Sequence, residues 1–304
     1  MAYGAAGRTC TVLPLVRWTR QCCQGVLPVT DSQPVDKRLV RKHFGRHAED
    51  YDRYAVVQQR VVQRLVELLP SSAPLPLALE VGTGTGSFAR ALGGKWPDLP
   101  LVLSDLAHGM TCHAHGQNPR SFALDADAVS LPFLPRRFSA VFSTSVYQWV
   151  DDLSGAFGEA SRILTPGGLF GFALFGERSL SELRASHRHA MQRYGRGRLS
   201  HAQEYPSVEE VRRALQVSGF DIRLLHEEDE LDFHPDVPAL LRSLKKIGAG
   251  NASVNRPHGL ASRRVMTEMI DHYGRQYGCD EGIVATYHVI YGLAICTEKS
   301  DSIR

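Results

Sequence analysis

Glycines at every second position, preceded by an acidic residue, form the part of the sequence best suited to chemistry. Glu80 ends a short apolar run, and Gly82, Gly84 and Gly86 follow it. Glycine lets a backbone approach a ligand with no Cβ in the way, and the free N–H groups at the start of the next helix favour polar or anionic groups. The stretch therefore predicts a nucleotide site where a strand turns into a helix.

Two kinds of nucleotide fit this turn. Residues 84–89 match the pattern of proteins that bind nicotinamide dinucleotides, and Asp105 follows at roughly the 20-residue spacing of an acid that binds ribose. However, the carboxylate of Glu80 would repel a pyrophosphate, whereas it could face the ammonium group of S-adenosylmethionine. A further acid, Asp127, is placed to accept a hydrogen bond from an adenine amino group. These acids favour S-adenosylmethionine, and an NAD-dependent oxidoreductase is the alternative.

The ordered set of motifs resembles the class I S-adenosylmethionine-dependent methyltransferases. It comprises residues 80–86 (EVGTGTG), Asp105 and residues 127–133 (DAVSLPF). The resemblance implies an α/β fold with a doubly wound, mostly parallel, seven-stranded sheet of the Rossmann-like kind. The residues expected to bind the cofactor are Glu80, Gly82, Gly84, Gly86, Asp105, Leu106, Met110, Asp127, Ala128 and Ser143.

Contacts with the nucleoside are predicted for Asp105, Met110 and Asp127. The carboxylate of Asp105 could accept hydrogen bonds from both ribose hydroxyls. Met110 could pack against the adenine because a thioether is polarisable, although a place in the core is equally compatible. Asp125 is the nearest rival of Asp127 for the adenine contact, but only Asp127 has the family's spacing to Leu131.

Alternating strands and helices are predicted around these motifs. Apolar and β-branched runs indicate strands, and apolar residues three or four positions apart indicate helices. The predicted strands cover residues 77–81, 99–105, 121–124, 138–143 and 169–175, one that starts at 222–225, and 283–295. The predicted helices after the glycine turn include residues 153–164, 208–217, 236–247 and 265–277. Without a repeat or a long linker, we expect one domain over residues 35–299.

A helical pattern precedes the first strand, and its first half is basic. Enzymes of this kind often fold a lid there, so residues 35–70 are expected to form an N-terminal helical lid. Within it, Tyr51 is the first candidate for catalysis and substrate binding, and His47 is a second substrate candidate. Residues 177–205 look helical but polar and predict an inserted helical cap. Its histidines are expected on the surface, because no carboxylate partners them at the spacing of a metal site.

The segment after the fourth predicted strand is a further candidate for the site. Ligands of doubly wound sheets bind beyond the carboxyl ends of the strands, so residues 144–150 should border the reacting group. Gln148 and Trp149 are therefore candidate catalytic residues, although a tryptophan there is about as often part of the core.

The composition excludes several classes of protein. The chain has 304 residues and 43% hydrophobic content, which is enough for a sizeable core. Its net charge of +3 argues against a dedicated nucleic-acid-binding protein, and no apolar run is long enough to predict a membrane helix. The six cysteines have neither zinc nor disulfide-scaffold spacing, which fits a reducing cytoplasm.

The first thirty residues differ from the rest in charge. They contain Arg8, Arg17 and Arg20 but no acid before Asp31. We expect a poorly ordered tail over residues 1–34, and a targeting segment or an upstream extension is the alternative.

A narrower resemblance rests on three segments. The segment around Tyr51, the pair Gln148 and Trp149, and residues 240–251 (LLRSLKKIGAGN) together are similar to the malonyl-acyl-carrier-protein O-methyltransferases of biotin synthesis. This resemblance runs from about residue 35 to residue 297. Thr144 departs from it, because that family and the trans-aconitate methyltransferases usually carry asparagine there.

The resemblance implies methylation of the free carboxylate of malonyl on acyl carrier protein, or on coenzyme A, early in pimelate and biotin synthesis. Tyr51 and Gln148 would orient the acceptor oxygens, and Arg242 would offset the charge. The carrier protein of this pathway is acidic, so a complementary basic patch is expected. Its predicted members are Lys37, Arg38, Arg41, Lys42, Lys245 and Lys246.

Two other function classes stay open. A carboxyl methyltransferase for a small free acid such as trans-aconitate would not need the basic patch. A non-catalytic protein that keeps the fold for assembly or binding would bind the cofactor weakly or not at all. Neither the residues nor the resemblance predict a metal site.

Overall fold

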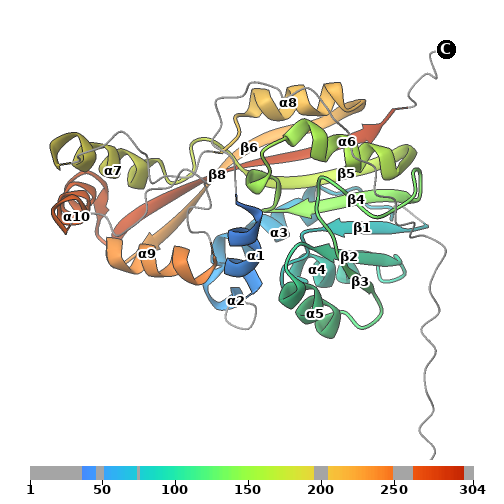
Figure 1. The fold of residues 1–304 in the computed structure, drawn as a ribbon, viewed down its shortest axis with the longest axis horizontal. Helices are drawn as coiled ribbons and strands as arrows, with labels where there is room; N and C mark the ends of the chain where they lie inside the picture. Colours follow the sequence, from blue (N-terminus) through green and yellow to red (C-terminus); the bar gives the residue numbers. More distant parts are fainter. Residues whose placement is uncertain (1–35, 46–50, 74–75, 195–204, 249–262, 298–304) are drawn as a thin grey trace, which may run out of the picture.

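The fold is built on one mixed sheet with helices on both faces, as the computed structural model shows (Figure 1). The structure describes residues 36–45, 51–73, 76–194, 205–248 and 263–297. Its strands are β1 Ala78–Val81, β2 Leu101–Asp105, β3 Phe122–Asp125, β4 Phe138–Thr144, β5 Leu164–Phe175, β6 Phe220–His234, β7 Gly278–Cys279 and β8 Gly282–Cys296. The order across the sheet is β3-β2-β1-β4-β5-β8-β6, and β7 pairs with β8.

The strand directions confirm the expected fold class. Neighbouring strands among β1 to β5 are parallel, and β8 is antiparallel to both β5 and β6. Within the described residues, the two-residue β7 is added to the seven predicted strands. Parallel neighbours need crossover connections, which explains the helix after each of β1, β2 and β4.

Helices precede β1, connect the strands and fill the C-terminal half. They are α1 Lys37–Gly45, α2 Tyr51–Tyr54, α3 Val56–Leu68, α4 Ser87–Lys95, α5 His108–Gln117, α6 Leu153–Ile163, α7 Ser181–Tyr194, α8 Val208–Val217, α9 Val237–Lys246 and α10 Arg263–Tyr277. A short 3₁₀ turn, η1 (Tyr147–Trp149), comes after β4. Ser207 and Glu210 close the start of α8 with a capping box, which satisfies backbone N–H groups that the helix leaves unpaired.

Successive residues of β1 are buried on opposite faces of the sheet. Ala78 belongs to a core cluster that includes Leu65 of α3 and Phe88 of α4. Leu79 belongs to a second cluster, which includes Phe157 of α6 and Leu215 of α8. The apolar run of β1 is continuous because helices cover both faces of the strand. This burial fixes the position of the turn after β1.

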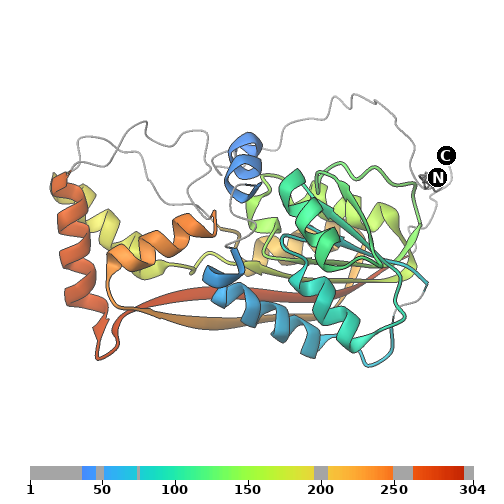
Figure 2. The same cartoon turned by 90° about the horizontal axis from the view of Figure 1, so that it is seen from below.

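The two longest described strands extend well beyond the parallel part of the sheet. β6 and β8 have 15 residues each and pair from Phe220 with Cys296 to His234 with Ile283. Their far end carries α7, α9 and α10, and α7 packs against α10 (Figure 2). These three helices form a group of their own, and α9 contacts α2.

The observed helices refine the sequence prediction at two places. The helical pattern of residues 37–69 is divided into α1, α2 and α3, with Ala55 outside helical geometry between the last two. In the predicted cap, the described helix is α7, whereas the sequence suggested helix over residues 177–205. The predicted helix at residues 208–217 is confirmed as α8. Within the described residues, no helix is long and apolar enough to cross a membrane.

Candidate active site

The glycine turn after β1 has the backbone geometry that the sequence predicts. Gly82, Gly84 and Gly86 all have positive φ, at 71°, 54° and 79°. A Cβ on Gly82 would lie 2.1 Å from Cγ2 of Val146, so this position cannot hold a side chain without moving the loop after β4. A Cβ on Gly84 would meet no atom within 4 Å, and this residue lines a pocket. The turn therefore presents bare backbone to a cavity.

Glu80, at the tip of β1, is fully buried. One of its carboxyl oxygens, Oε2, accepts a hydrogen bond from the hydroxyl of Thr83 at 2.9 Å. The other, Oε1, has no hydrogen-bond partner among the described residues. Burial, which outweighs the Thr83 hydrogen bond, raises the pKa of Glu80 from 4.5 to about 8. An unpaired buried carboxyl oxygen fits a ligand that donates from a cationic group, such as an ammonium.

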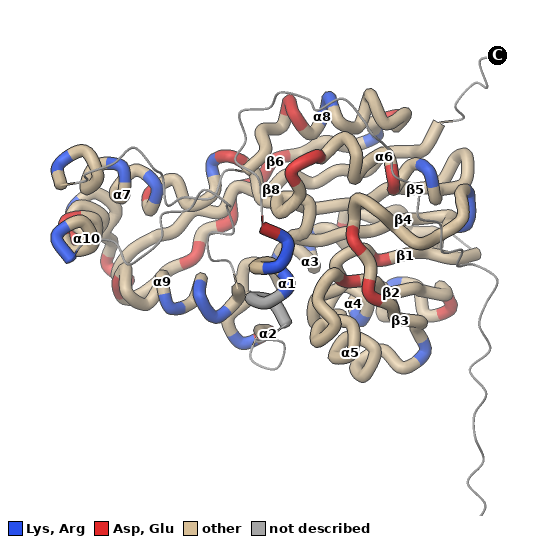
Figure 3. Tube along the Cα trace, viewed as in Figure 1, with Lys and Arg blue, Asp and Glu red and all other residues tan. Residues whose placement is uncertain are grey.

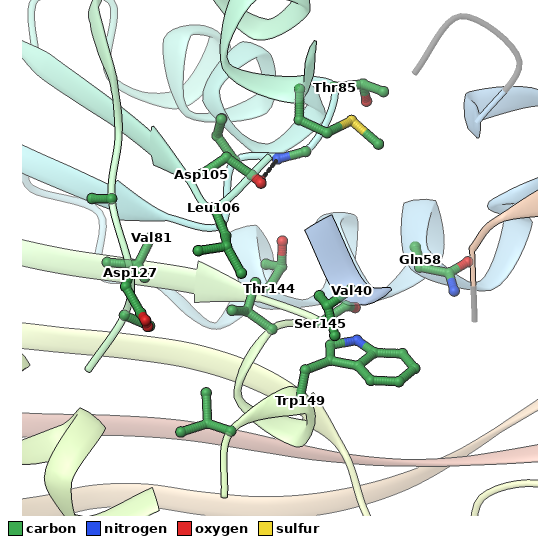
Figure 4. Close-up of a pocket in the computed structure, with 18 of the residues that line it drawn as sticks. Val40, Gln58, Val81, Thr85, Asp105, Leu106, Asp127, Thr144, Ser145 and Trp149 are labelled. Carbon is green, nitrogen blue, oxygen red and sulfur yellow. Dashed lines mark hydrogen bonds between the residues drawn. The ribbon is translucent and has the colours of Figure 1, made fainter. Parts of the chain in front are cut away.

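Asp105, at the tip of β2, holds the glycine turn in place. Its Oδ2 accepts from the backbone N–H of Gly84 at 2.9 Å (Figure 4). Its Oδ1 accepts from the backbone N–H of Ala107 at 2.8 Å. Burial raises the pKa of Asp105, although both backbone hydrogen bonds act in the opposite direction. Each carboxyl oxygen keeps a second lone pair, so the group can still accept hydrogen bonds from two hydroxyls.

Asp127, beyond the end of β3, is in contact with the N-terminal helix α1. The ammonium of Lys37 lies 2.7 Å from Oδ2 of Asp127, and the N–H of Val129 donates to Oδ1 at 3.2 Å. The same helix approaches β3 a second time, because a guanidinium nitrogen of Arg41 lies 3.9 Å from Asp125. The N-terminal helix α1 therefore reaches the third acid of the motif set.

A pocket lies over the tips of β1, β2 and β4 and brings most of the predicted cofactor residues together (Figure 4). It encloses about 960 Å³ of space between atoms, part of it open to solvent. We call it the first pocket. The predicted residues that line it are Gly82, Gly84, Asp105, Leu106, Met110, Asp127 and Ala128, together with Tyr51 and Trp149.

Three predicted cofactor residues lie beside the first pocket and do not line it. Glu80 and Ser143 are fully buried, and the hydroxyl of Ser143 donates to the carbonyl of Val81 at 2.9 Å. Gly86 packs against α5, where an added Cβ would lie 3.2 Å from Cα of Ala114. Ser143 and Gly86 therefore shape the strand tips and the turn in this structure.

A second pocket adjoins the first and contains the remaining catalytic candidate. The two pockets share the lining residues Tyr51, Gln58, Ser145 and Trp149. The second pocket encloses about 390 Å³ of space between atoms, and Gln148 lines it. Its other lining residues are Phe175, Leu180, Tyr205, Leu244, Ile247 and Tyr287.

The second pocket is lined by apolar groups and neutral hydrogen-bonding groups. Burial raises the pKa of Tyr205 to about 12 and also raises the pKa values of Tyr51 and Tyr287. These hydroxyls therefore stay protonated near neutral pH and can donate hydrogen bonds. Among the lining residues that the structure describes, none is a lysine or an arginine.

Asp52 joins the lid to the glycine turn and was not singled out from the sequence. Its Oδ1 accepts from the hydroxyl of Thr85 at 2.6 Å, and its Oδ2 lies 3.3 Å from a guanidinium nitrogen of Arg90. Because Asp52 is next to Tyr51 on α2, these contacts position Tyr51 over both pockets. Its position directly after Tyr51 in the sequence could have indicated this role.

The substrate candidate Arg242 does not reach the pockets. The side chain of Arg242 is 71% exposed and lies 3.9 Å from Asp236. It lines neither pocket, so the structure does not place it to offset the charge of an acceptor. His47 lies outside the described residues, so its position is not assigned. No group of three or more potential metal ligands occurs within the described residues.

Comparison with known proteins adds to this geometry. A methyltransferase-domain family matches residues 79–172. A malonyl-[acyl-carrier protein] O-methyltransferase of Geobacter sulfurreducens is 44% identical over 263 residues, which cover 85% of this chain and 98% of the relative. The enzyme of the same description from Methylococcus capsulatus is 31% identical, covering 85% of this chain and 93% of the relative. Among solved structures, the YcgJ protein of Bacillus subtilis superposes with a TM-score of 0.56 over 79% of this chain and 99% of its own, and its 14% identity shows a shared fold alone.

Proposed function

This chain belongs to the malonyl-[acyl-carrier protein] O-methyltransferase family, and on that premise we propose that it methylates the free carboxylate of malonyl on acyl carrier protein. The methyl donor is S-adenosylmethionine, and the product is a methyl ester that enters pimelate and biotin synthesis. We expect the protein in the cytoplasm, together with the acyl carrier protein. The observation that carries the proposal is the meeting of two pockets at Tyr51, Ser145 and Trp149, one lined by strand-tip acids and the other by neutral donors.

The first pocket is proposed to hold S-adenosylmethionine, which supplies an electrophilic methyl group on a sulfonium. Glu80 has a carboxyl oxygen for the ammonium end, and Asp105 has lone pairs for the ribose hydroxyls. Asp127 would accept from the adenine amino group in place of Lys37. The bare backbone at Gly84 leaves room for close approach of the ligand.

The second pocket is proposed to hold the malonyl group. A carboxylate has a reference pKa of about 4, so the acceptor is ionised near neutral pH and no base is required. S-adenosylmethionine would supply the methyl group to one of the carboxylate oxygens, and its sulfur would leave as a neutral thioether. Catalysis then depends on in-line positioning. Tyr51 and Gln148, which line the second pocket, would take this role, and neutral donors leave the oxygen more nucleophilic than a cation would.

The segment that is most particular to this family supports the acceptor assignment. Residues 240–251 begin inside α9 and continue past its last residue, and two of them, Leu244 and Ile247, line the second pocket. Leu180 and Tyr205, from the proposed cap over residues 177–205, line the same pocket. We therefore assign the cap to acceptor binding and residues 35–70 to a lid over both substrates.

The carrier protein is proposed to dock on basic residues of α1 and α9. Figure 3 shows lysine and arginine on α1 and on the part of α9 that lies nearest to α2. Arg38 and Lys245 are exposed, and the ammonium of Lys246 lies 5.8 Å from the ring centre of Tyr54 on α2. Lys37 and Arg41 face Asp127 and Asp125, so they are less free for a partner than the sequence suggested. The side chain of Lys42 lies outside the described residues.

The proposal is tested by offering labelled S-adenosylmethionine with malonyl-acyl-carrier protein, malonyl-CoA or trans-aconitate. We expect label in the malonyl thioesters, with the carrier-linked form preferred. Label in trans-aconitate alone would identify a small-acid methyltransferase. Tight binding of S-adenosylmethionine with no product from any acceptor would favour a non-catalytic role in assembly or binding.

A further inference from the structure

Ser145 has a backbone conformation that serine rarely adopts. It comes directly after the last residue of β4 with a φ of 57°, and its N–H donates to the carbonyl of Ala173 on β5 at 2.8 Å. A positive φ is strained for a residue with a Cβ, and such strain is concentrated at functional sites. Glycine would adopt the same φ with less strain, so the presence of a side chain here calls for an explanation.

The hydroxyl of Ser145 is buried and has no hydrogen-bond partner among the described residues. The amide oxygen of Gln148, on the same loop, is also buried without a hydrogen-bond partner among the described residues. Buried polar atoms are nearly always hydrogen-bonded, because an unpaired one has lost its water without replacement. Two such atoms on one loop indicate that the loop is built to meet a polar ligand.

The position of Ser145 indicates which ligand that is. Ser145 lines both pockets, as do Tyr51 and Trp149, and Figure 4 shows it between Thr144 and Trp149. The glycine turn and Asp105 lie on one side of this boundary, and Leu244 and Ile247 lie on the other. A donor at the boundary is next to the path along which the methyl group would pass.

We propose that the hydroxyl of Ser145 donates a hydrogen bond to the carboxylate oxygen of the acceptor that does not take the methyl group. This assignment rests on the proposed function. The attacking oxygen loses its negative charge as the C–O bond forms, so a donor on it would stabilise the ground state more than the transition state. A donor on the other oxygen binds the carboxylate and leaves the attacking electron pair free, so losing it raises KM more than it lowers kcat.

For a carboxylate to bind Ser145, the groups that cover its hydroxyl in this structure have to move. The hydroxyl oxygen is covered from solvent, and Tyr51 lines both pockets beside it.

The experiment compares Ser145→Ala and Ser145→Gly with the whole wild-type chain. Alanine removes the hydroxyl and keeps the strained backbone, whereas glycine removes both the hydroxyl and the strain. For both variants we expect KM for malonyl-acyl-carrier protein to rise roughly 10- to 100-fold, the loss typical of one hydrogen bond to a charged group. We expect kcat and the Kd for S-adenosylmethionine to change less than about threefold, which is below the effect of one typical neutral hydrogen bond. Ser154→Ala, at an exposed serine of α6, is the matched control.

Each other outcome overturns a stated claim. Wild-type KM in Ser145→Ala or in Ser145→Gly would overturn the role of the hydroxyl while the proposed function stands. An equal loss in acceptor and cofactor binding would show a structural role for Ser145 and also overturn the proposal. If the wild-type chain does not methylate malonyl-acyl-carrier protein at all, the proposed function and this inference fail together.

Discussion

Nζ of Lys37 lies 2.7 Å from Oδ2 of Asp127, so the lid helix α1 occupies the carboxylate that we assign to the adenine amino group. Both side chains are partly exposed, and such pairs typically contribute about 0.2–1 kcal/mol. Lys37→Ala should therefore lower the Kd for S-adenosylmethionine by up to about fivefold, because the cofactor no longer competes with the ammonium. Calorimetric titration measures this change.

Arg38→Ala is the matched control, because Arg38 is an exposed cation next to Lys37 on the same helix. Its Kd for the cofactor should equal that of the wild-type chain. Weaker cofactor binding in Lys37→Ala would contradict competition and would mean that the ammonium helps to hold the nucleotide.

The buried carboxyl of Glu80 should make cofactor binding release a proton. In the free protein its pKa is about 8, and the ammonium of the cofactor favours the charged form. At pH 7 we therefore expect release of up to about one proton per cofactor bound, falling toward none as the pH rises past 8. Calorimetry in buffers of different ionisation enthalpy measures the number.

The same shift predicts the pH dependence of stability. Between pH 4.5 and about 8 the unfolded chain loses the Glu80 proton that the folded chain retains, so Glu80 makes the free protein less stable as pH rises through this window. Glu80→Gln should remove that slope and the proton release, and it should weaken cofactor binding roughly 10- to 100-fold. A Glu80→Gln variant that still releases a proton would show that another group titrates.

Asp52 should be needed for the position of Tyr51. Asp52→Ala removes the acceptor of the Thr85 hydroxyl, which ties α2 to the glycine turn, and we expect kcat to fall about tenfold. Asp52→Asn keeps an oxygen for Thr85 and should recover most of the rate. Steady-state kinetics with both substrates saturating test this, with Asp98→Ala at an exposed site as control. An equal loss in both Asp52 variants would assign the effect to the ion pair with Arg90.

The basic surface on α1 and α9 should affect KM for the carrier-linked substrate and not KM for a small thioester. Arg38→Glu combined with Lys245→Glu should raise KM for malonyl-acyl-carrier protein about tenfold at low salt, with the effect decreasing as salt screens the charges. The variant should treat a malonyl thioester of N-acetylcysteamine as the wild-type chain does. Arg137→Glu with Arg213→Glu makes the same charge change at other exposed positions. Equal effects on both acceptors would exclude this surface as the docking site.

The sequence located the half of the candidate site that depends on local spacing. Glu80 and Asp105 lie at strand tips and Gly84 lies in the turn after β1, and the alternation of apolar runs with turns locates such positions directly. The hydrogen bond from the N–H of Gly84 to the carboxylate of Asp105 is then a consequence of the parallel pairing of β1 with β2.

The other half depends on contacts between distant segments. Tyr205 and Tyr287 line the second pocket together, yet in the sequence they cannot be told from ordinary buried tyrosines. Ser145 gave no signal because its residue type does not indicate a positive φ, unlike the glycines after β1. Arg242 was chosen for its charge, but its place on α9 turns it toward Asp236 and solvent.

Tyr51 and Ser145 line both pockets, so a nucleoside bound in the first pocket and an acid bound in the second would be neighbours. A single inhibitor that joins adenosine to a malonate mimic would therefore bind both halves with one loss of translational and rotational freedom. Such a compound would discriminate against other adenosine-binding enzymes, because its acidic arm would require Leu244, Ile247 and the tyrosines of the second pocket.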